Sequence, residues 1–289
     1  MKNIKLNMSD IGFGANVLGI AHGYIMINKL KPNLAERIDY LNHKLCDEDM
    51  KQTNCKFYNT VYNASLEIYN KNLNDLNNGN LVITVGGDHS LALGSVKASM
   101  EATKEEIGLI WIDAHADLNT FEISESGNIH GMPVSGLLGI NDEKYNNLGN
   151  KKRIKPENIV YFAIRAVDNE EKKLIEKYDI KEYSDKIIKN KSFDVCLAEA
   201  IDYLKKITTK VHISLDLDGI NPKLIKGVST PVVGGLELED PIKLIREINK
   251  NFEIVSIDIV EYNPLTDVDE ATVEYLENLL NDISEIEFK

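Results

Sequence analysis

Short apolar runs rich in branched residues alternate with longer amphipathic stretches along the chain. The runs have the length and composition of buried strands: LVITV (81–85), GLIWIDA (108–114), IVYFAI (159–164), VHISLDLD (211–218) and EIVSIDIVE (253–261). The longer stretches have helical periodicity, as in LALGSVKASMEATKEE, SFDVCLAEAIDYLKKI and DPIKLIREINKN. Strands that alternate with helices in this way predict a parallel sheet with helices on both faces.

The alternation continues without a Pro/Ser-rich linker, a low-complexity tract or a convincing repeat. We therefore expect a single three-layer α/β domain over residues 1–289, with a central, mostly parallel β-sheet. The segment from about 44 to 78 has the weakest pattern, and we interpret it as a helix with its exit turn.

Composition narrows the class of protein. Apolar residues make up 43% of the chain and charged residues 27%, as in soluble globular proteins. A net charge of −13 with scattered lysines argues against a nucleic-acid partner. The chain has neither a signal-peptide core nor an apolar run of the roughly 20 residues that span a membrane. Because Cys46, Cys55 and Cys196 form no C-x-x-C pair, we expect a cytoplasmic protein.

Acidic and imidazole side chains directly follow three of the predicted strands. They occur in Gly86-Gly87-Asp88-His89-Ser90, Asp113-Ala114-His115-Ala116-Asp117 and Asp216-Leu217-Asp218-Gly219. Ligands of open parallel sheets bind at the carboxyl ends of the strands. Since alternate side chains of extended backbone point to the same side, Asp113, His115 and Asp117 can converge, as can Asp216 and Asp218.

This spacing predicts a metal centre. The candidate ligands are His89, Asp113, His115, Asp117, Asp216 and Asp218. Crowded carboxylates repel one another unless cations lie among them. The six candidate ligands are oxygen and imidazole donors, with no thiolate, and they are more than one tetrahedral zinc ion binds. They suit two cations that share bridging carboxylates. We expect two Mn²⁺ per subunit, although the same donors accept Co²⁺ or Fe²⁺.

Six segments resemble, in their order, the ureohydrolase family and the arginases in particular. They are GGDHS, DAHADLN, SGNIHGMPVS, SLDLDGINP, STPVVGGL and DIVEYNP, within residues 80–264. The resemblance implies the arginase-like fold and a homo-oligomer, a trimer or a hexamer. The ligand sets that it implies are His89, Asp113, Asp117 and Asp216 for one manganese ion, and Asp113, His115, Asp216 and Asp218 for the other.

The resemblance also implies a reaction, the hydrolysis of L-arginine to L-ornithine and urea. A hydroxide that bridges the two metals would attack the guanidinium carbon. Asp117 would pass the proton to the departing nitrogen, and Glu261 would pair with the guanidinium. His130 is similar to the arginase histidine that shuttles protons, although outside this motif it would be an ordinary loop histidine.

Further polar residues correspond to the arginase contacts with the amino-acid end of the substrate. They are Asn119, Ser124 and Ser126, which can donate to a carboxylate, and Asp168 and Glu171 on the ammonium side. Asn-Glu-Glu follows Asp168 here instead of the commoner Pro-Gly-Glu, which weakens the assignment of Glu171. Each residue alone would be an ordinary loop polar residue.

Other functions share part of this pattern. An agmatinase, a guanidinobutyrase or a formimidoylglutamase would have the same metal core. A silent metal-binding protein would have lost one of the ligands or Glu261, but all of them are present here. The chain departs from the family at residues 19–28, which lack the usual acidic residue, proline and arginine, and its C-terminal segment is short. We exclude His22, His43 and His212 from the site for lack of ligand spacing.

Overall fold

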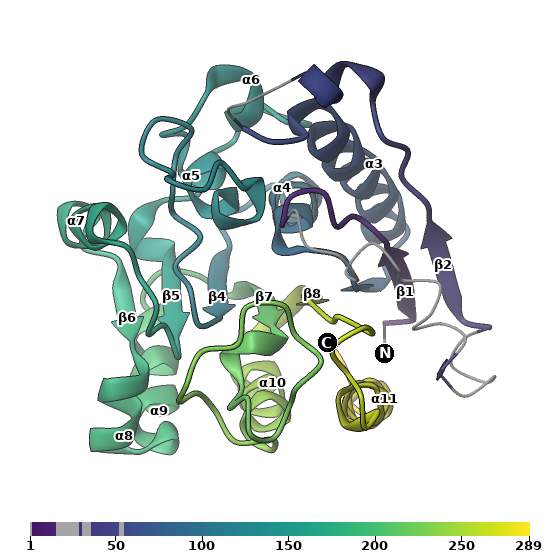
Figure 1. Cartoon of the computed structure of the whole chain (residues 1–289). Helices are drawn as coiled ribbons and strands as arrows, with labels where there is room; N and C mark the ends of the chain where they lie inside the picture. Colours follow the sequence, from purple (N-terminus) through teal and green to yellow (C-terminus); the bar gives the residue numbers. More distant parts are fainter. Residues whose placement is uncertain (1, 16–28, 31–35, 52–54) are drawn as a thin grey trace.

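A parallel sheet of eight strands forms the centre of the computed structural model, which describes residues 2–15, 29–30, 36–51 and 55–289. The strand order is β2-β1-β3-β8-β7-β4-β5-β6, and all of these neighbours pair in parallel (Figure 1). The strands are β1 (Ile4–Ser9), β2 (Ile38–Leu41), β3 (Leu81–Val85), β4 (Gly108–Ile112), β5 (Ile159–Phe162), β6 (Lys181–Tyr183), β7 (Lys210–Asp216) and β8 (Glu253–Val260).

The five strands predicted from apolar runs are confirmed as β3, β4, β5, β7 and β8. Three strands were not predicted: β1, β2 and β6. The outer strands β2 and β6 are short and half-buried, so they lack a continuous apolar run. In β1 the polar Asn7 is buried because its amide donates to Asn72 Oδ1 at 2.9 Å and to Asp75 Oδ2 at 3.0 Å.

Helices cover both faces of the sheet, as predicted (Figure 1). One face carries α3 (Tyr58–Asn77), α4 (Ala92–Thr103), α5 (Pro133–Leu138), α6 (Glu143–Asn146) and α7 (Asn169–Tyr178). The other carries α8 (Asp185–Lys191), α9 (Phe193–Leu204), α10 (Asp240–Asn251) and α11 (Ala271–Ser284). Short 3-10 helices are η1 (Asp47–Lys51), η2 (His89–Leu91), η3 (Ile129–Gly131), η4 (Pro156–Asn158) and η5 (Leu217–Gly219). Helix α3 confirms the helix expected in the weakly patterned segment.

Two apolar cores lie between the helices and the sheet, one on each face. In α9, Cys196 is fully buried beside Leu197 and Ala200, which confirms it as a small core side chain. His212 is a fully buried strand residue, also as expected. The departure at residues 19–28 and His22 lie outside the described residues. No helix in the described part of the chain is long and apolar enough to cross a membrane.

The strand order determines where the polar strand ends lie. Strands β3, β8, β7 and β4 are consecutive in the centre of the sheet and run parallel, so their carboxyl ends meet at one edge. The chain turns sharply there after β3, where Gly86 and Gly87 both have φ of 77°. A residue with a side chain rarely adopts this left-handed backbone, which explains the glycine pair.

Candidate metal centre

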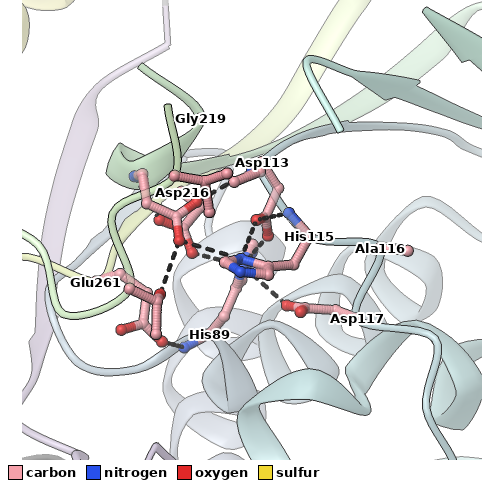
Figure 2. A network of polar contacts seen from close by, with 12 residues as sticks. His89, Asp113, His115, Ala116, Asp117, Asp216, Gly219 and Glu261 are labelled. Atoms are coloured by element: carbon pink, nitrogen blue, oxygen red, sulfur yellow. Dashed lines mark hydrogen bonds and ion pairs between the residues drawn. The ribbon is translucent and has the colours of Figure 1, made fainter. Parts of the chain in front are cut away.

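The four central strands each deliver part of one polar cluster. His89 begins η2 after β3, and the segment from Asp113 to Asp117 follows β4. Asp216 ends β7, and Glu261 directly follows β8. Figure 2 shows that these side chains, with His115, point toward one another. All of the predicted ligands therefore come together, although their strands are far apart in the sequence.

His89 forms the first half of the cluster. Its Nδ1 lies 2.9 Å from Asp113 Oδ2, 3.2 Å from Asp117 Oδ2 and 3.3 Å from Asp216 Oδ2. The imidazole stacks on Trp111, with ring centroids 3.9 Å apart and an interplanar angle of 8°. One ring nitrogen and three carboxylates thus face one point, and the His89 ring has a fixed plane.

His115 forms the second half. Its Nδ1 lies 3.3 Å from Asp113 Oδ1 and 3.1 Å from Asp218 Oδ2. Asp113 therefore presents one oxygen to each histidine, which is the placement expected of a bridging ligand. Asp216 contacts the His89 half through Oδ2, whereas its Oδ1 accepts the backbone N–H of Asp218 at 2.7 Å. The bridging role of Asp216 stays a prediction.

The electrostatics of the cluster fit cations. Burial, followed by the charges of Asp218 and Asp113, raises the pKa of Asp216 well above its ordinary value. Burial and the charge of Asp113 raise the pKa of Asp117 to about 6. Burial acts in the same direction on Asp113, but hydrogen bonds with His115 and His89 outweigh it and lower its pKa. Like charges held this close require positive charge among them, and the oxygen and imidazole donors suit divalent ions.

Glu261 lies beside the His89 half of the cluster. Its Oε1 accepts the backbone N–H of His89 at 2.9 Å and pairs with His130 Nδ1 at 3.0 Å. Its Oε2 is buried and has no hydrogen-bond partner among the described residues. A buried carboxylate oxygen of this kind is costly to leave unpaired and is suited to accept from a cationic ligand.

Two residues of the cluster have unusual backbone conformations. Asp117 has φ of 50° and Glu261 has φ of 66°, although neither is glycine. A left-handed conformation at such residues costs about 1–3 kcal/mol and occurs mainly where surrounding structure enforces it. The backbone N–H of Glu261 is held by Gly87 O at 2.8 Å, which directs the chain after β8 back toward His89.

His130 is linked to the cluster only through Glu261. Burial lowers the pKa of His130, but the hydrogen bond and charge of Glu261 outweigh it and raise the pKa to about 9. The side chain of His130 keeps 19% of its exposure, so it connects the buried carboxylate to solvent. That position is compatible with proton exchange.

Asp88 is a positioning residue that the sequence analysis missed. It is fully buried and accepts from Gly14 N at 2.8 Å, from Ala15 N at 3.2 Å and from both polar groups of Ser90. The carbonyl of Gly14 in turn accepts the backbone N–H of His130 at 3.2 Å. Asp88 therefore holds the first loop of the chain against the loop that carries His130. The Asp-x-Ser pattern before a helix was the available signal.

The predicted substrate contacts form two groups. Asn119 Nδ2 donates to Asp168 Oδ2 at 3.1 Å, so these two residues lie together. Ser124 Oγ and Ser126 Oγ are 3.5 Å apart and accept backbone N–H groups of their own loop. The described structure contains no hydrogen bond or ion pair between the two groups.

Glu171 is engaged with the backbone. Its carboxylate accepts from Leu118 N at 2.9 Å and from Asp168 N at 3.0 Å, and the side chain is buried. The second bond is half of a capping box with Asp168 at the start of α7. Glu171 thus joins α7 to the loop after Asp117, and its role as a substrate contact stays a prediction.

Comparison with known proteins agrees with this geometry. The Arginase family model matches residues 16–284. An arginase from Entamoeba histolytica is 33% identical over 264 residues, covering 87% of this chain and 88% of that protein. The Bacillus subtilis arginase is 41% identical over 203 residues, or 68% of each chain. The crystal structure of the E. histolytica arginase in complex with L-ornithine superposes with a TM-score of 0.88 at 29% identity, covering 99% of this chain and 100% of that one. The chain therefore belongs to the arginase family.

Proposed function

We propose that this protein hydrolyses L-arginine to L-ornithine and urea. The observation that carries the proposal is the convergence of six carboxylate and imidazole ligands beside the unpaired Oε2 of Glu261. A ligand cluster next to a buried anionic acceptor suits a positively charged guanidinium group. Membership of the arginase family supports the same reaction.

We propose Mn²⁺ for both ions. One would be held by His89, Asp113, Asp117 and Asp216, and the other by Asp113, His115, Asp216 and Asp218. When bound, the ions supply a water acidic enough to act as the nucleophile near neutral pH. Oxygen and imidazole ligands are the donors that manganese accepts.

The protein's own residues bind the substrate and move protons. Glu261 accepts guanidinium N–H groups at Oε2 and so orients the carbon that is attacked. Asp117 carries a proton to the departing nitrogen, because departure of an amide anion is prohibitively uphill. His130, paired with Glu261 and partly exposed, exchanges protons with solvent.

The predicted substrate contacts, which we call the rim residues, would bind the amino-acid end of arginine. Asn119, Ser124 and Ser126 offer donors for the carboxylate, and Asp168, supported by Glu171, offers an anion for the ammonium. A site with such groups rejects an analogue that leaves them unpaired. Agmatine lacks the carboxylate, so we expect arginine to be the better substrate.

One assay tests substrate and metal together. Urea release is measured from arginine, agmatine and guanidinobutyrate after treatment with a chelator, with and without added Mn²⁺. We expect arginine to be hydrolysed only with Mn²⁺. Agmatine hydrolysis of equal kcat/KM would favour an agmatinase, and Mn²⁺ binding without turnover of any substrate would favour a silent metal-binding protein.

A variant tests the rim assignment separately. Asp168→Ala should raise KM for arginine at least tenfold, an effect of about 1.4 kcal/mol, and leave Mn²⁺ content unchanged. Asp194→Ala is the matched control, because Asp194 is an exposed residue paired with Lys243 far from the rim loop. An unchanged KM in Asp168→Ala would remove Asp168 from the substrate site.

We also infer that the protein is a cytoplasmic homo-oligomer, a trimer or a hexamer, whose partner is a small molecule. The family resemblance supports the assembly, and the absence of disulfides among Cys46, Cys55 and Cys196 supports a reducing compartment. Sedimentation equilibrium would give the number of subunits directly, and a monomer would contradict the assembly.

A further inference from the structure

A chain of buried polar groups extends from His89 into the sheet, on the side covered by α4. His89 Nε2 lies 2.9 Å from Ser214 Oγ, and Ser214 Oγ lies 3.4 Å from Asp258 Oδ2. Asp258 Oδ2 also accepts from Ser95 Oγ of α4 at 2.5 Å and contacts His212 Nε2 at 2.9 Å. All five residues have no solvent exposure. The register of β7 against β8 places Ser214 directly opposite Asp258.

The directions of these hydrogen bonds follow from Asp258. The hydroxyls of Ser95 and Ser214 both donate to Asp258 Oδ2, and His212 Nε2 lies within hydrogen-bond distance of the same oxygen. Because Ser214 uses its only proton toward Asp258, its oxygen must accept from His89 Nε2–H. The neutral His89 ring then carries its proton on Nε2, and the lone pair of Nδ1 faces the carboxylate cluster.

We propose that Asp258, acting through Ser214, is a positioning residue that fixes the ring orientation and tautomer of His89 for cation binding. The inference rests on the proposed metal centre and adds residues that lie outside its ligand sets. A metal-binding histidine that donates its other N–H to an anchored group binds more strongly than a free one, because ring plane and tautomer are set in advance. The stacking of Trp111 on His89 also fixes the plane of the His89 ring.

The hydrogen-bonded chain of side chains from His89 to Asp258 contacts only one half of the metal centre. The other histidine, His115, keeps 31% side-chain exposure, and its Nε2 has no hydrogen-bond partner among the described residues. Loss of this hydrogen-bonded chain should therefore weaken the binding of the ion held by His89 and leave the binding of the ion beside His115 and Asp218 unchanged. A general loss of stability would not discriminate between the two ions.

The test is Ser214→Ala, which deletes the hydroxyl between His89 and Asp258. The matched control is Ser256→Ala on β8, also fully buried, whose hydroxyl donates to Val82 O at 2.8 Å and takes no part in the chain. Mn²⁺ binding to the full-length protein is measured from the electron paramagnetic resonance signal of free Mn²⁺. Thermal unfolding in chelator checks that both variants are folded.

We expect Ser214→Ala to weaken one of two binding steps by about 10–100-fold, and Ser256→Ala to keep both within about twofold. Asp258→Asn, which can turn an N–H toward Ser214, should weaken the same step. Unchanged binding in Ser214→Ala, or an equal loss in Ser256→Ala, would overturn the inference and leave the metal centre standing. Failure of the unaltered protein to bind Mn²⁺ would overturn the proposed function and this inference together.

Discussion

Replacing Glu261 by Gln removes one negative charge at the end of β8 without shortening the side chain. Glu261 is almost fully buried, and its Oε1 is held by the backbone N–H of His89 and by His130. A glutamine would keep its oxygen toward these two donors. Its amide nitrogen would then occupy the position of Oε2, where the guanidinium is proposed to bind.

The expected loss is large because the interaction is buried and charged. Removing one partner of a buried, hydrogen-bonded charge pair costs about 2–5 kcal/mol. At about 1.4 kcal/mol per factor of ten, this is a decrease of about 30-fold to several thousand-fold in kcat/KM for arginine. The amide N–H groups would also point at guanidinium N–H groups, so we expect no compensating hydrogen bond.

Stability should change much less than activity. The charge of Glu261 acts after burial to raise the pKa of Asp88 to about 6, so removing it relieves repulsion. The same change weakens the bond to His130, and the two effects oppose each other. We expect a change in Tm within about 2 °C, which corresponds to about 1 kcal/mol in a chain of this size.

The measurement is urea release under steady-state conditions at saturating Mn²⁺, together with calorimetric unfolding. Glu253→Gln is the control, because Glu253 begins the same strand at the opposite edge of the sheet and pairs with Lys2 at 2.6 Å. A kcat/KM within about threefold of the unaltered protein in Glu261→Gln would refute the reasoning. An equal loss of kcat/KM in Glu253→Gln would show that any change in β8, and not the loss of the Glu261 charge, lowers the activity.

Two further predictions concern the loops around Glu261. The Glu261 pair raises the pKa of His130 from 6.5 to about 9 against burial, so the stability it adds is complete below about pH 6.5 and is lost as pH rises through about 9. In urea unfolding, the stability difference between the unaltered protein and His130→Asn should therefore shrink by up to about 3 kcal/mol between pH 6 and pH 9.5, and a constant difference would contradict this pKa. Gly14→Ala should cost about 1–3 kcal/mol, because its Cβ would lie 2.6 Å from Asp88 Oδ1. Gly131→Ala, which has no other atom within 4 Å of its Cβ, should cost less than about 1 kcal/mol. Equal losses in urea unfolding would argue against the role of Asp88 in holding the first loop against the loop that carries His130.

Local patterns predicted the central strands and several of the helices. The β3 and β4 runs are continuous and apolar because both of their faces are buried, and the periodicity of α10 matches its bounds. Local patterns missed β1, whose buried Asn7 is paired with side chains of α3 that are distant in the sequence. A polar residue with a distant partner is indistinguishable in the sequence from an exposed one.

The sequence by itself determined which residues could hold metal, because alternation along a strand places Asp113, His115 and Asp117 on one side. Only the tertiary structure decided that β3, β8, β7 and β4 are neighbours, and so that His89 faces Asp113 at 2.9 Å and lies beside Glu261. The tertiary structure likewise showed that Glu171 caps a helix. The physical reason is that strand order and burial are set by packing of the whole chain, whereas side-chain alternation is set by the geometry of each strand.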